Sequence, residues 1–274
     1  MPQNRNAEMV NNLTQDFARR NEFNQSGARL SDVMMWLNRD GGGSMIWAFD
    51  AQDQLCYGRG AAAGAVWAET NIDVSNYAAT ANGGPYVTLN GTDEYLSIAD
   101  AAWQEPGSYS FLVWGWAYPT VATLSTIFAK WNFLAPANDR SWRLYMPNAG
   151  TLAFQVNSTG APAANVSVGS GVVATLNTWH FVAGYYSPSS LLAIGTATAD
   201  SPSLTYVTNT ASIPALLWDT GSALYIGALS GAAAVDDHWT GRIGPGLARF
   251  NVPATNIRSH MTRLFHATRW FYQE

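Results

Sequence analysis

Cysteine is almost absent from this 274-residue chain, because Cys56 is the only one. One cysteine excludes an intrachain disulfide and any zinc site built from cysteines. Long apolar runs are missing as well. None approaches the ~18 residues of a membrane span, and the opening MPQNRNAEMV lacks the charged-then-apolar layout of a signal peptide. We therefore expect a protein made in a cytoplasm, without a membrane span, that reaches any outer location by another exit such as cell lysis.

Charge is scarce and unevenly distributed. Charged residues make up 12% of the sequence, about half of the usual ~25%. Residues 60–241 hold eleven acids against three bases, a balance of −8, whereas residues 242–274 hold five arginines against one glutamate, a balance of +4. The five arginines are spread out without lysine or a dense cluster, which makes a poor track for phosphates. We expect the basic end to pack on an acidic protein surface, of its own chain or a neighbour's, and not to bind nucleic acid.

The first 43 residues are predicted to form a helical N-terminal arm. A narrow apolar stripe runs through the first half, and in the second half Ser31 or Asp32 caps a helix that Gly41 ends. Helices this short have little core of their own and must dock elsewhere. The side chains expected to anchor the arm are Val10, Leu13, Phe17, Met34 and Trp36. Residues 44–84 read as extra strands or a connector that the sequence does not place in a sheet.

Short strand-like runs separated by Gly, Pro, Asn and Ser dominate the rest of the chain. Residues 85–98, YVTLNGTDEYLSI with the preceding proline, predict two strands around Asn90-Gly91, a dipeptide typical of tight turns. Further strands are expected at Thr126–Trp131, Trp142–Met146, Leu152–Asn157, Trp179–Ser187, Leu191–Thr196, Leu204–Thr208, Leu224–Ala228 and Gly241–Phe250. Many short strands with almost no helix between them favour an antiparallel two-sheet sandwich over residues 85–253.

The segment after the predicted sandwich, residues 254–274, is expected to form a short C-terminal helix followed by a basic tail. Pro253 stands just before it, and Ile257, Met261, Leu264 and Phe265 follow a helical spacing. The helix therefore carries an apolar stripe that needs a surface to pack on.

One run, SYSFLVWGWAYPT at residues 108–120, is apolar on both faces of a strand. Phe111, Val113 and Ala117 suit the layer between two sheets, which leaves a second face of large aromatics: Trp114, Trp116 and Tyr118. This face is covered by protein, whether the N-terminal arm, the C-terminal stripe or a neighbouring subunit, or it stacks on sugar rings. These three residues are thus candidates for carbohydrate binding or for an interface.

Taken in order, the runs resemble one family. YVTLNGTDEYLSIAD is similar to the opening hairpin of laminin-G-like domains, which belong to the concanavalin-A-like lectin/glucanase jelly rolls. SYSFLVWGWAYP, STIFAKWN, SWRLYM, GTLAFQV, ATLNTWHFVAGYYS and ALYIGALSG are similar to later strands of that fold, and WTGRIGPGLARFNVPATNIRSHMTRLF to its final strand and the short helix after it. The resemblance spans residues 85–265 and implies a mainly β, concanavalin-A-like jelly roll. It departs from the family at AIGTATADSPSL and over the first 84 residues. A helical arm before such a jelly roll resembles surface proteins of tailed bacteriophage virions.

The sequence offers little for catalysis. The family includes glycoside hydrolases, which need two carboxylates flanking the scissile bond. The six glutamates are Glu8, Glu22, Glu69, Glu94, Glu105 and Glu274, and none has another carboxylate two or four residues away in a strand-like run. Asp93 and Glu94 are neighbours at a turn, so they would face opposite sides. We therefore expect no enzyme activity and no catalytic residue.

Asp236 and Asp237, followed by His238, are the one grouping that suits a metal. The resemblance implies a rim where calcium is often held by carboxylates and backbone oxygens. The alternative, which we favour, is a solvated loop before Trp239, so that no cofactor is needed.

Two functions remain open from the sequence. The leading hypothesis is a non-enzymatic structural subunit of a large assembly, a capsid decoration or surface protein of a bacteriophage virion. It would be a homo-oligomer in contact with other virion proteins and located in the virion. The alternative is a lectin or host-adhesion module that binds cell-surface glycans.

Overall fold

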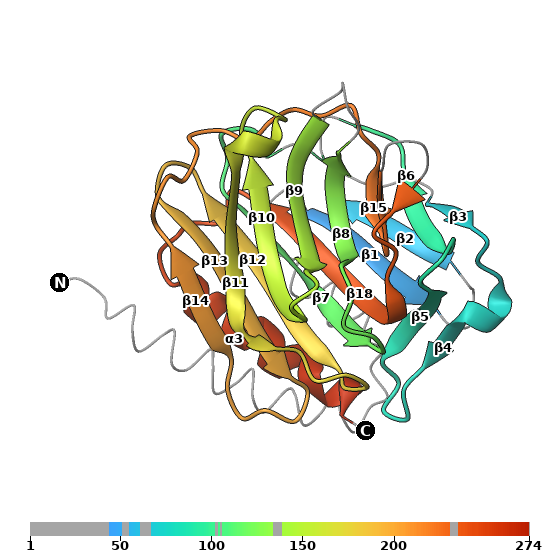
Figure 1. The fold of residues 1–274 in the computed structure, drawn as a ribbon. Coiled ribbons are helices and arrows are strands. Elements are labelled where there is room, and N and C mark those ends of the chain that lie inside the picture. The colour runs from blue at the N-terminus through green and yellow to red at the C-terminus, as the bar shows by residue number, and fades with distance from the viewer. Residues whose placement is uncertain are drawn as a thin grey trace.

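The computed structural model describes residues 44–50, 55–60, 67–101, 104, 106–133, 139–230 and 235–273, with backbone alone for 44–50, 55–60, 247, 249 and 250. They form two mostly antiparallel sheets packed face to face, and one short helix near the C-terminus (Figure 1). This confirms the mainly β jelly-roll sandwich. The predicted arm and its anchoring residues lie outside the described residues.

Sheet A is the rear layer in Figure 1. Its strands run in the order β14 (Thr205–Asn209), β13 (Leu191–Thr198), β12 (His180–Ser187), β7 (Phe111–Pro119), β18 (Thr240–Phe250), β1 (Ser44–Asp50) and β2 (Leu55–Gly60). β5 (Pro85–Asn90) also pairs with β18, and β4 (Tyr77–Ala79) pairs with β5. The segment at 44–60 that the sequence could not place therefore extends this sheet.

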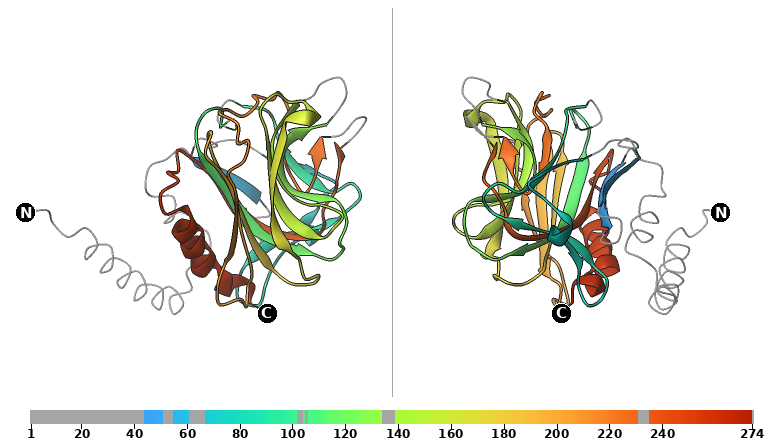
Figure 2. Two further views of the ribbon diagram at one scale, coloured as in Figure 1. Left: turned by 60° about the vertical axis from the view of Figure 1, so that its left-hand side comes forward. Right: turned by 90° about the vertical axis from the view of Figure 1, so that its right-hand side faces the viewer.

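Sheet B is the front layer. Its order is β11 (Asn165–Val173), β10 (Thr151–Asn157), β9 (Asp139–Met146), β8 (Ser125–Asn132), β15 (Leu224–Ile226), β6 (Tyr95–Ile98) and β3 (Ala68–Thr70). A two-strand strap, β16 (Leu229–Ser230) and β17 (Val235–Asp236), joins the sheet beside β8. Helix α3 (Ile257–Thr268) and the 3-10 turn η4 (Arg269–Tyr272) lie on the side of sheet A that faces away from sheet B (Figure 2). Two more 3-10 turns, η1 (Val74–Asn76) and η3 (Pro162–Ala164), lie in connections.

The space between the sheets is filled by large side chains that lie directly on glycines of the facing sheet. A methyl group added at Gly184 of β12 would come within 2.5 Å of the Phe154 ring, and one at Gly115 of β7 within 2.7 Å of the Phe128 ring. All four residues sit at strand positions where side chains of both sheets meet. The glycines in these runs therefore exist to admit aromatic rings into a closely packed core.

The second apolar face of β7 is covered by the chain itself. Trp114 and Trp116 are fully buried in a second hydrophobic cluster, between sheet A and α3 with η4. The Trp116 ring stacks on Tyr272 with centroids 4.7 Å apart, and its indole Nε1 donates to Thr268 Oγ1 at 3.0 Å. Of the covers considered for this face, the C-terminal stripe is the one observed. All four stripe residues of α3 are buried against it.

This arrangement corrects the assignment of Trp114 and Trp116 as carbohydrate-binding or interface candidates, because neither ring reaches the surface. Tyr118 is only partly buried. Its ring lies 5.3 Å from that of Trp179, and the Arg242 guanidinium lies 4.7 Å from its centroid. The tyrosine therefore forms the edge of the same covered cluster.

The expected hairpin at residues 85–98 is wrong in one respect. Its two strands exist, but β5 belongs to sheet A and β6 to sheet B, so they do not pair. The chain crosses between the sheets at Gly91, whose φ is +76°. A Cβ there would lie 1.8 Å from Thr240 Oγ1, so glycine is required for the close approach as well as for the turn.

Candidate functional site

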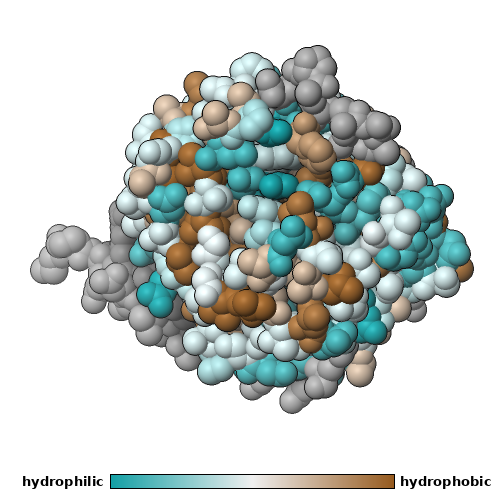
Figure 3. Space-filling view, viewed as in Figure 1, coloured by the Kyte–Doolittle hydropathy of each residue, from teal (hydrophilic) through white to brown (hydrophobic). Residues whose placement is uncertain are grey.

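The outward face of sheet B carries a continuous row of side chains, which the strand register defines. Starting at β11 and crossing to β6, the paired positions are Ser167, Gln155, Arg143, Ala129, Tyr225 and Ser97. Figure 3 looks onto this face and shows hydrophilic side chains grouped over β8, β9 and β10, with hydrophobic ones between them. The face is thus neither a plain solvated surface nor a simple apolar patch.

An arginine–aromatic cluster lies at the centre of this face. The Arg143 guanidinium lies 3.9 Å from the ring centroid of Tyr145 and 4.8 Å from that of Trp131. Arg140, which pairs with Trp131 across the strands, lies 5.8 Å from the same indole ring. Leu229 of the strap packs against Trp131, which is 2% exposed. The buried indole ring thus makes a cation–π contact with each of the two guanidinium groups. We call Trp131, Arg140, Arg143 and Tyr145 the arginine cluster.

Hydrogen bonds fix the Arg143 guanidinium in one orientation. Its Nε donates to Gln155 Oε1 at 2.9 Å, and its Nη1 lies 3.4 Å from Asp237 Oδ2 on the strap. Burial is the largest influence on both pKa values: it lowers the pKa of Arg143 and raises the pKa of Asp237. The ion pair between the two side chains opposes both changes. Arg140 lies close enough to repel Arg143 electrostatically, which further disfavours its charge. The face therefore holds two partly buried guanidinium groups in a low-dielectric setting.

Two buried polar atoms of this face have no hydrogen-bond partner. Arg140 Nε and Thr126 Oγ1 are each inaccessible and unpaired, although Arg140 belongs to the cluster and Thr126 pairs in register with Tyr145. Most buried polar groups in proteins are satisfied, so unpaired ones call for a specific explanation.

Asp236 and Asp237, the residues considered for a metal, lie beside the arginine cluster. Among the residues that the structure describes, no group of three or more His, Cys, Asp or Glu side chains could hold a metal ion. Asp237 instead faces Arg143, and Asp236 accepts from the Asp237 backbone N–H at 2.8 Å. Asp236 thus ends the strap, and Asp237, the next residue, faces Arg143 of the arginine cluster.

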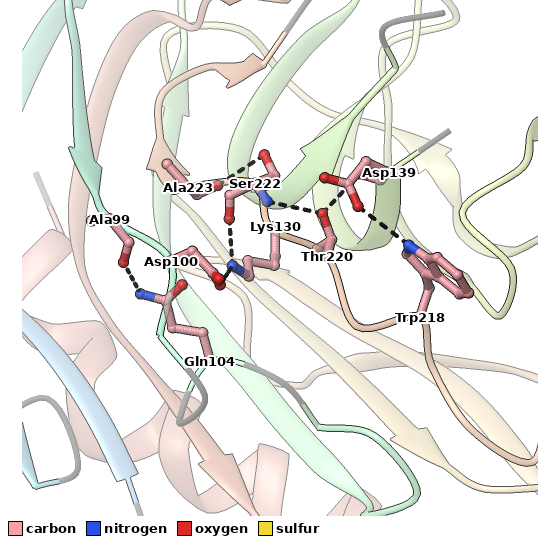
Figure 4. A network of polar contacts seen from close by, with 9 residues as sticks. All are labelled: Ala99, Asp100, Gln104, Lys130, Asp139, Trp218, Thr220, Ser222 and Ala223. Atoms are coloured by element: carbon pink, nitrogen blue, oxygen red, sulfur yellow. Dashed lines mark hydrogen bonds and ion pairs between the residues drawn. The ribbon is translucent and has the colours of Figure 1, made fainter. Parts of the chain in front are cut away.

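A second feature lies at the end of the sandwich where β8 ends and β9 begins (Figure 4). Trp218, in the loop before β15, is 39% exposed, and its Nε1 donates to Asp139 Oδ1 at 3.2 Å. Its backbone N–H donates to the Asn157 carbonyl at 2.9 Å, and Thr220 Oγ1 donates to the Asp139 carbonyl at 3.1 Å. Hydrogen bonds thus hold Trp218 both at its backbone and at the edge of its exposed indole ring. We call this feature the Trp218 corner.

A buried lysine anchors the strands below the Trp218 corner. Lys130 is fully buried, and its Nζ donates to Asp100 Oδ1 and to the Ser222 carbonyl, as Figure 4 shows. Ser222 N–H in turn donates to Thr220 Oγ1 at 3.1 Å. The ammonium therefore ties the end of β6 and the loop before β15 to β8, and it fixes the loop that carries Trp218.

Sequence reasoning missed both features. The arginine cluster joins residues of two strands, β8 and β9, so no single run of sequence displays it. One signal was present: Lys130, Arg140 and Arg143 are the three bases of residues 60–241, and they fall within 14 residues of one another. The signal for Trp218 was its place in LLWDTGS, a tryptophan next to polar turn residues.

The comparisons with known proteins agree on the fold. Solved structures similar to this chain include the binding domain of Paraclostridial mosquitocidal protein 1 (TM-score 0.57, 7% identity) and that of botulinum neurotoxin DC in complex with rat synaptotagmin II (0.54, 11%). The same neurotoxin domain in complex with SialylT is also similar (0.52, 9%). Each match covers 81–82% of this chain but only 51–52% of the other, so the chain spans about half the length of these structures.

No helix among the described residues is long and apolar enough to cross a membrane. Among curated proteins none matches the sequence significantly. A laminin-G family model, described as the concanavalin A-like lectin/glucanases superfamily, matches residues 90–244, which is more than half of the chain. The two sheets, their order and this match lead to one conclusion: the chain belongs to the concanavalin A-like lectin/glucanases superfamily.

Proposed function

We propose that this protein is a non-enzymatic carbohydrate-binding module, a lectin or adhesion domain, and that the Trp218 corner is its sugar-stacking platform. The observation that carries the proposal is the exposed Trp218 ring held by Asp139. Sugar rings present flat patches of C–H groups to an aromatic face, while their hydroxyls need polar partners at its rim. The corner supplies the indole face and, next to it, the Asp139 carboxylate.

The other tryptophans with described side chains support this choice. Trp270 is partly buried, and the other seven are buried: Trp67, Trp114, Trp116, Trp131, Trp142, Trp179 and Trp239. Trp218 alone in this set exceeds one third exposure. A ring that is fixed before the ligand arrives loses little conformational freedom on binding, which favours affinity.

The likeness to toxin binding domains is a weaker support. The botulinum neurotoxin DC domain was solved in complex with SialylT and, separately, in complex with rat synaptotagmin II. At 7–11% identity this likeness concerns the fold. The ligand of this chain is therefore argued from its own residues.

One of the observations that favoured a structural subunit on a phage virion no longer does so. The two-sided apolar strand suggested an assembly surface, but α3 covers that face within the chain. Self-assembly and a virion location stay predictions, and light scattering of the purified protein over a range of concentrations tests the first. A stable oligomer in that measurement would support the assembly hypothesis, and a monomer at all concentrations would count against it.

The binding proposal is tested by replacing the aromatic platform. We expect Trp218→Ala to lose about fivefold to a hundredfold in affinity for the glycans that the unmodified protein binds on an array, taking the ~1–3 kcal/mol of a base stacked on an aromatic ring as the scale for a stacked sugar. Leu216→Ala is the matched control, because Leu216 lies in the same loop and is 52% exposed but has no ring. Its binding is expected to stay unchanged.

Tryptophan fluorescence gives a second readout. Glycan addition is expected to shift or quench the emission of the unmodified protein and of Leu216→Ala, but not the emission of Trp218→Ala. A broad array without any bound glycan, or equal binding by both variants, would remove the proposal.

A further inference from the structure

The basic residues of the sandwich converge on one place. Residues 60–241 contain eleven acids and three bases, and all three bases lie on the adjacent strands β8 and β9. Lys130 points into the sandwich end and pairs with Asp100. Arg140 and Arg143 belong to the arginine cluster on the outward face of sheet B. An otherwise acidic body therefore presents positive charge at one point on this face.

That charge is not balanced by the described protein groups around it. Arg143 has one carboxylate within ion-pair distance, that of Asp237 at 3.4 Å. Arg140 is 9% exposed, and its Nε is buried without a partner. Partly buried cations with few counterions are costly. A ligand anion at the exposed part of the Arg143 side chain, which is 14% exposed, would relieve that cost.

The floor beside the cluster leaves room for a flat ligand. Next to Tyr145 in register stand Ala153 of β10 and then Gly169 of β11, both with minimal side chains. A Cβ placed on Gly169 would meet no atom within 4 Å. Gln155 and Ser167 border this floor in the neighbouring row, so amide and hydroxyl groups flank it. Arginine, amide, hydroxyl and a tyrosine edge are together suited to a hydroxylated ring that bears a carboxylate.

We propose that the arginine cluster binds the carboxylate of an acidic saccharide, a uronic or sialic acid, on the outward face of sheet B. The inference rests on the proposed carbohydrate-binding function and adds the ligand class. Asp139, which holds Trp218, lies four positions before Arg143 on β9, a rise of about 13 Å along the strand. A short oligosaccharide that reaches from the end of the sandwich onto this face would place a sugar ring on Trp218 and its acid at Arg143.

The test compares acids with their own neutral esters. The probes are oligogalacturonate and sialyllactose, each beside its methyl ester, and a poly-aspartate peptide, with affinities measured by calorimetry. For at least one saccharide we expect the acid to bind about tenfold more tightly than the ester, because hydrogen bonds between charged groups are the strong ones. Arg143→Gln is expected to abolish this preference, and Arg258→Gln, on the exposed side of α3, to leave it intact.

A second variant keeps the test decisive if Arg143→Gln does not fold. Asp237→Asn removes the competing carboxylate, so we expect it to increase the preference for the acid over the ester. Trp218→Ala is expected to weaken the binding of the acid and of its ester by the same factor. This result would distinguish the contribution of the Trp218 corner from that of the arginine cluster.

Each outcome decides the question. Equal affinity for acid and ester, or a preference unchanged in both Arg143→Gln and Asp237→Asn, overturns the arginine assignment while carbohydrate binding stands. Poly-aspartate bound as tightly as any saccharide assigns the face to acidic peptides and overturns the saccharide class. No binding of any saccharide overturns the proposed function together with this inference.

Discussion

Single polar contacts decide how the covering helix meets the aromatic strand. The indole N–H groups of Trp114, Trp142 and Trp239 are buried without hydrogen-bond partners, whereas that of Trp116 donates to Thr268. Thr268 Oγ1 also donates to the Leu264 carbonyl at 2.9 Å. One hydroxyl thus satisfies the strand below and the helix itself, and it fixes the position of α3 on β7.

We expect Thr268→Val to lower the free energy of unfolding by about 1–3 kcal/mol, because valine keeps the shape but leaves the buried Trp116 N–H unsatisfied. Chemical denaturation with fluorescence detection measures this. Thr262→Val is the control: Thr262 Oγ1 donates to the Arg258 carbonyl four residues back, as Thr268 does to Leu264, but no tryptophan depends on it. Equal effects of the two variants would show that the contact with Trp116 contributes nothing.

At the scale of strands, the fold depends on places where a side chain is absent. Gly184 of β12 admits the Phe154 ring, and Gly115 of β7 admits Phe128. Strands rich in such glycines have weak local preference for extended structure, so their stability comes from the ring packed on them.

We expect Gly184→Ala to destabilise the protein by about 1–3 kcal/mol, since a methyl group 2.5 Å from a buried ring must displace it. Gly169→Ala in β11 is the matched control, because it is also a strand glycine but would meet nothing within 4 Å. The control is expected to be neutral or slightly stabilising. Thermal melts of both variants measure the difference, and a tolerated Gly184→Ala would contradict the packing described.

The strands also show what the sequence can and cannot predict. Runs such as residues 191–196 and the stripe of α3 were predictable because their pattern is local. The pairing of β5 and β6 was not, since the Asn90-Gly91 turn looks the same whether the chain turns back or crosses to the other sheet. β11 was missed because it is largely exposed and because Gly169 and Gly171 interrupt its valines. The arginine cluster depends on the register across β8 and β9, which no local pattern contains.

For the whole molecule, the important feature is that one strand belongs to two cores. Phe111, Val113 and Ala117 of β7 pack between the sheets, while Leu112, Trp114 and Trp116 pack under α3. Loss of either core removes one wall of the other. The described sandwich and its helix are therefore expected to unfold together.

We expect the thermal unfolding transitions followed by far-UV circular dichroism, by near-UV circular dichroism and by tryptophan fluorescence to coincide. Thr268→Val should shift all three by the same amount. A fluorescence transition that precedes the loss of β-structure would show that α3 separates from sheet A while the sandwich stays folded.

The contact between Trp116 and Thr268 joins residues 152 positions apart. During synthesis, β7 therefore emerges from the ribosome long before the segment that covers it, and β18, its neighbour in the sheet, also comes late. Until residue 272 has been made, the nascent chain exposes a strip of large aromatics that has no native partner. We therefore expect the sandwich to fold only after its C-terminal segment has left the ribosome, and the emerging β7 to be a binding segment for chaperones until then.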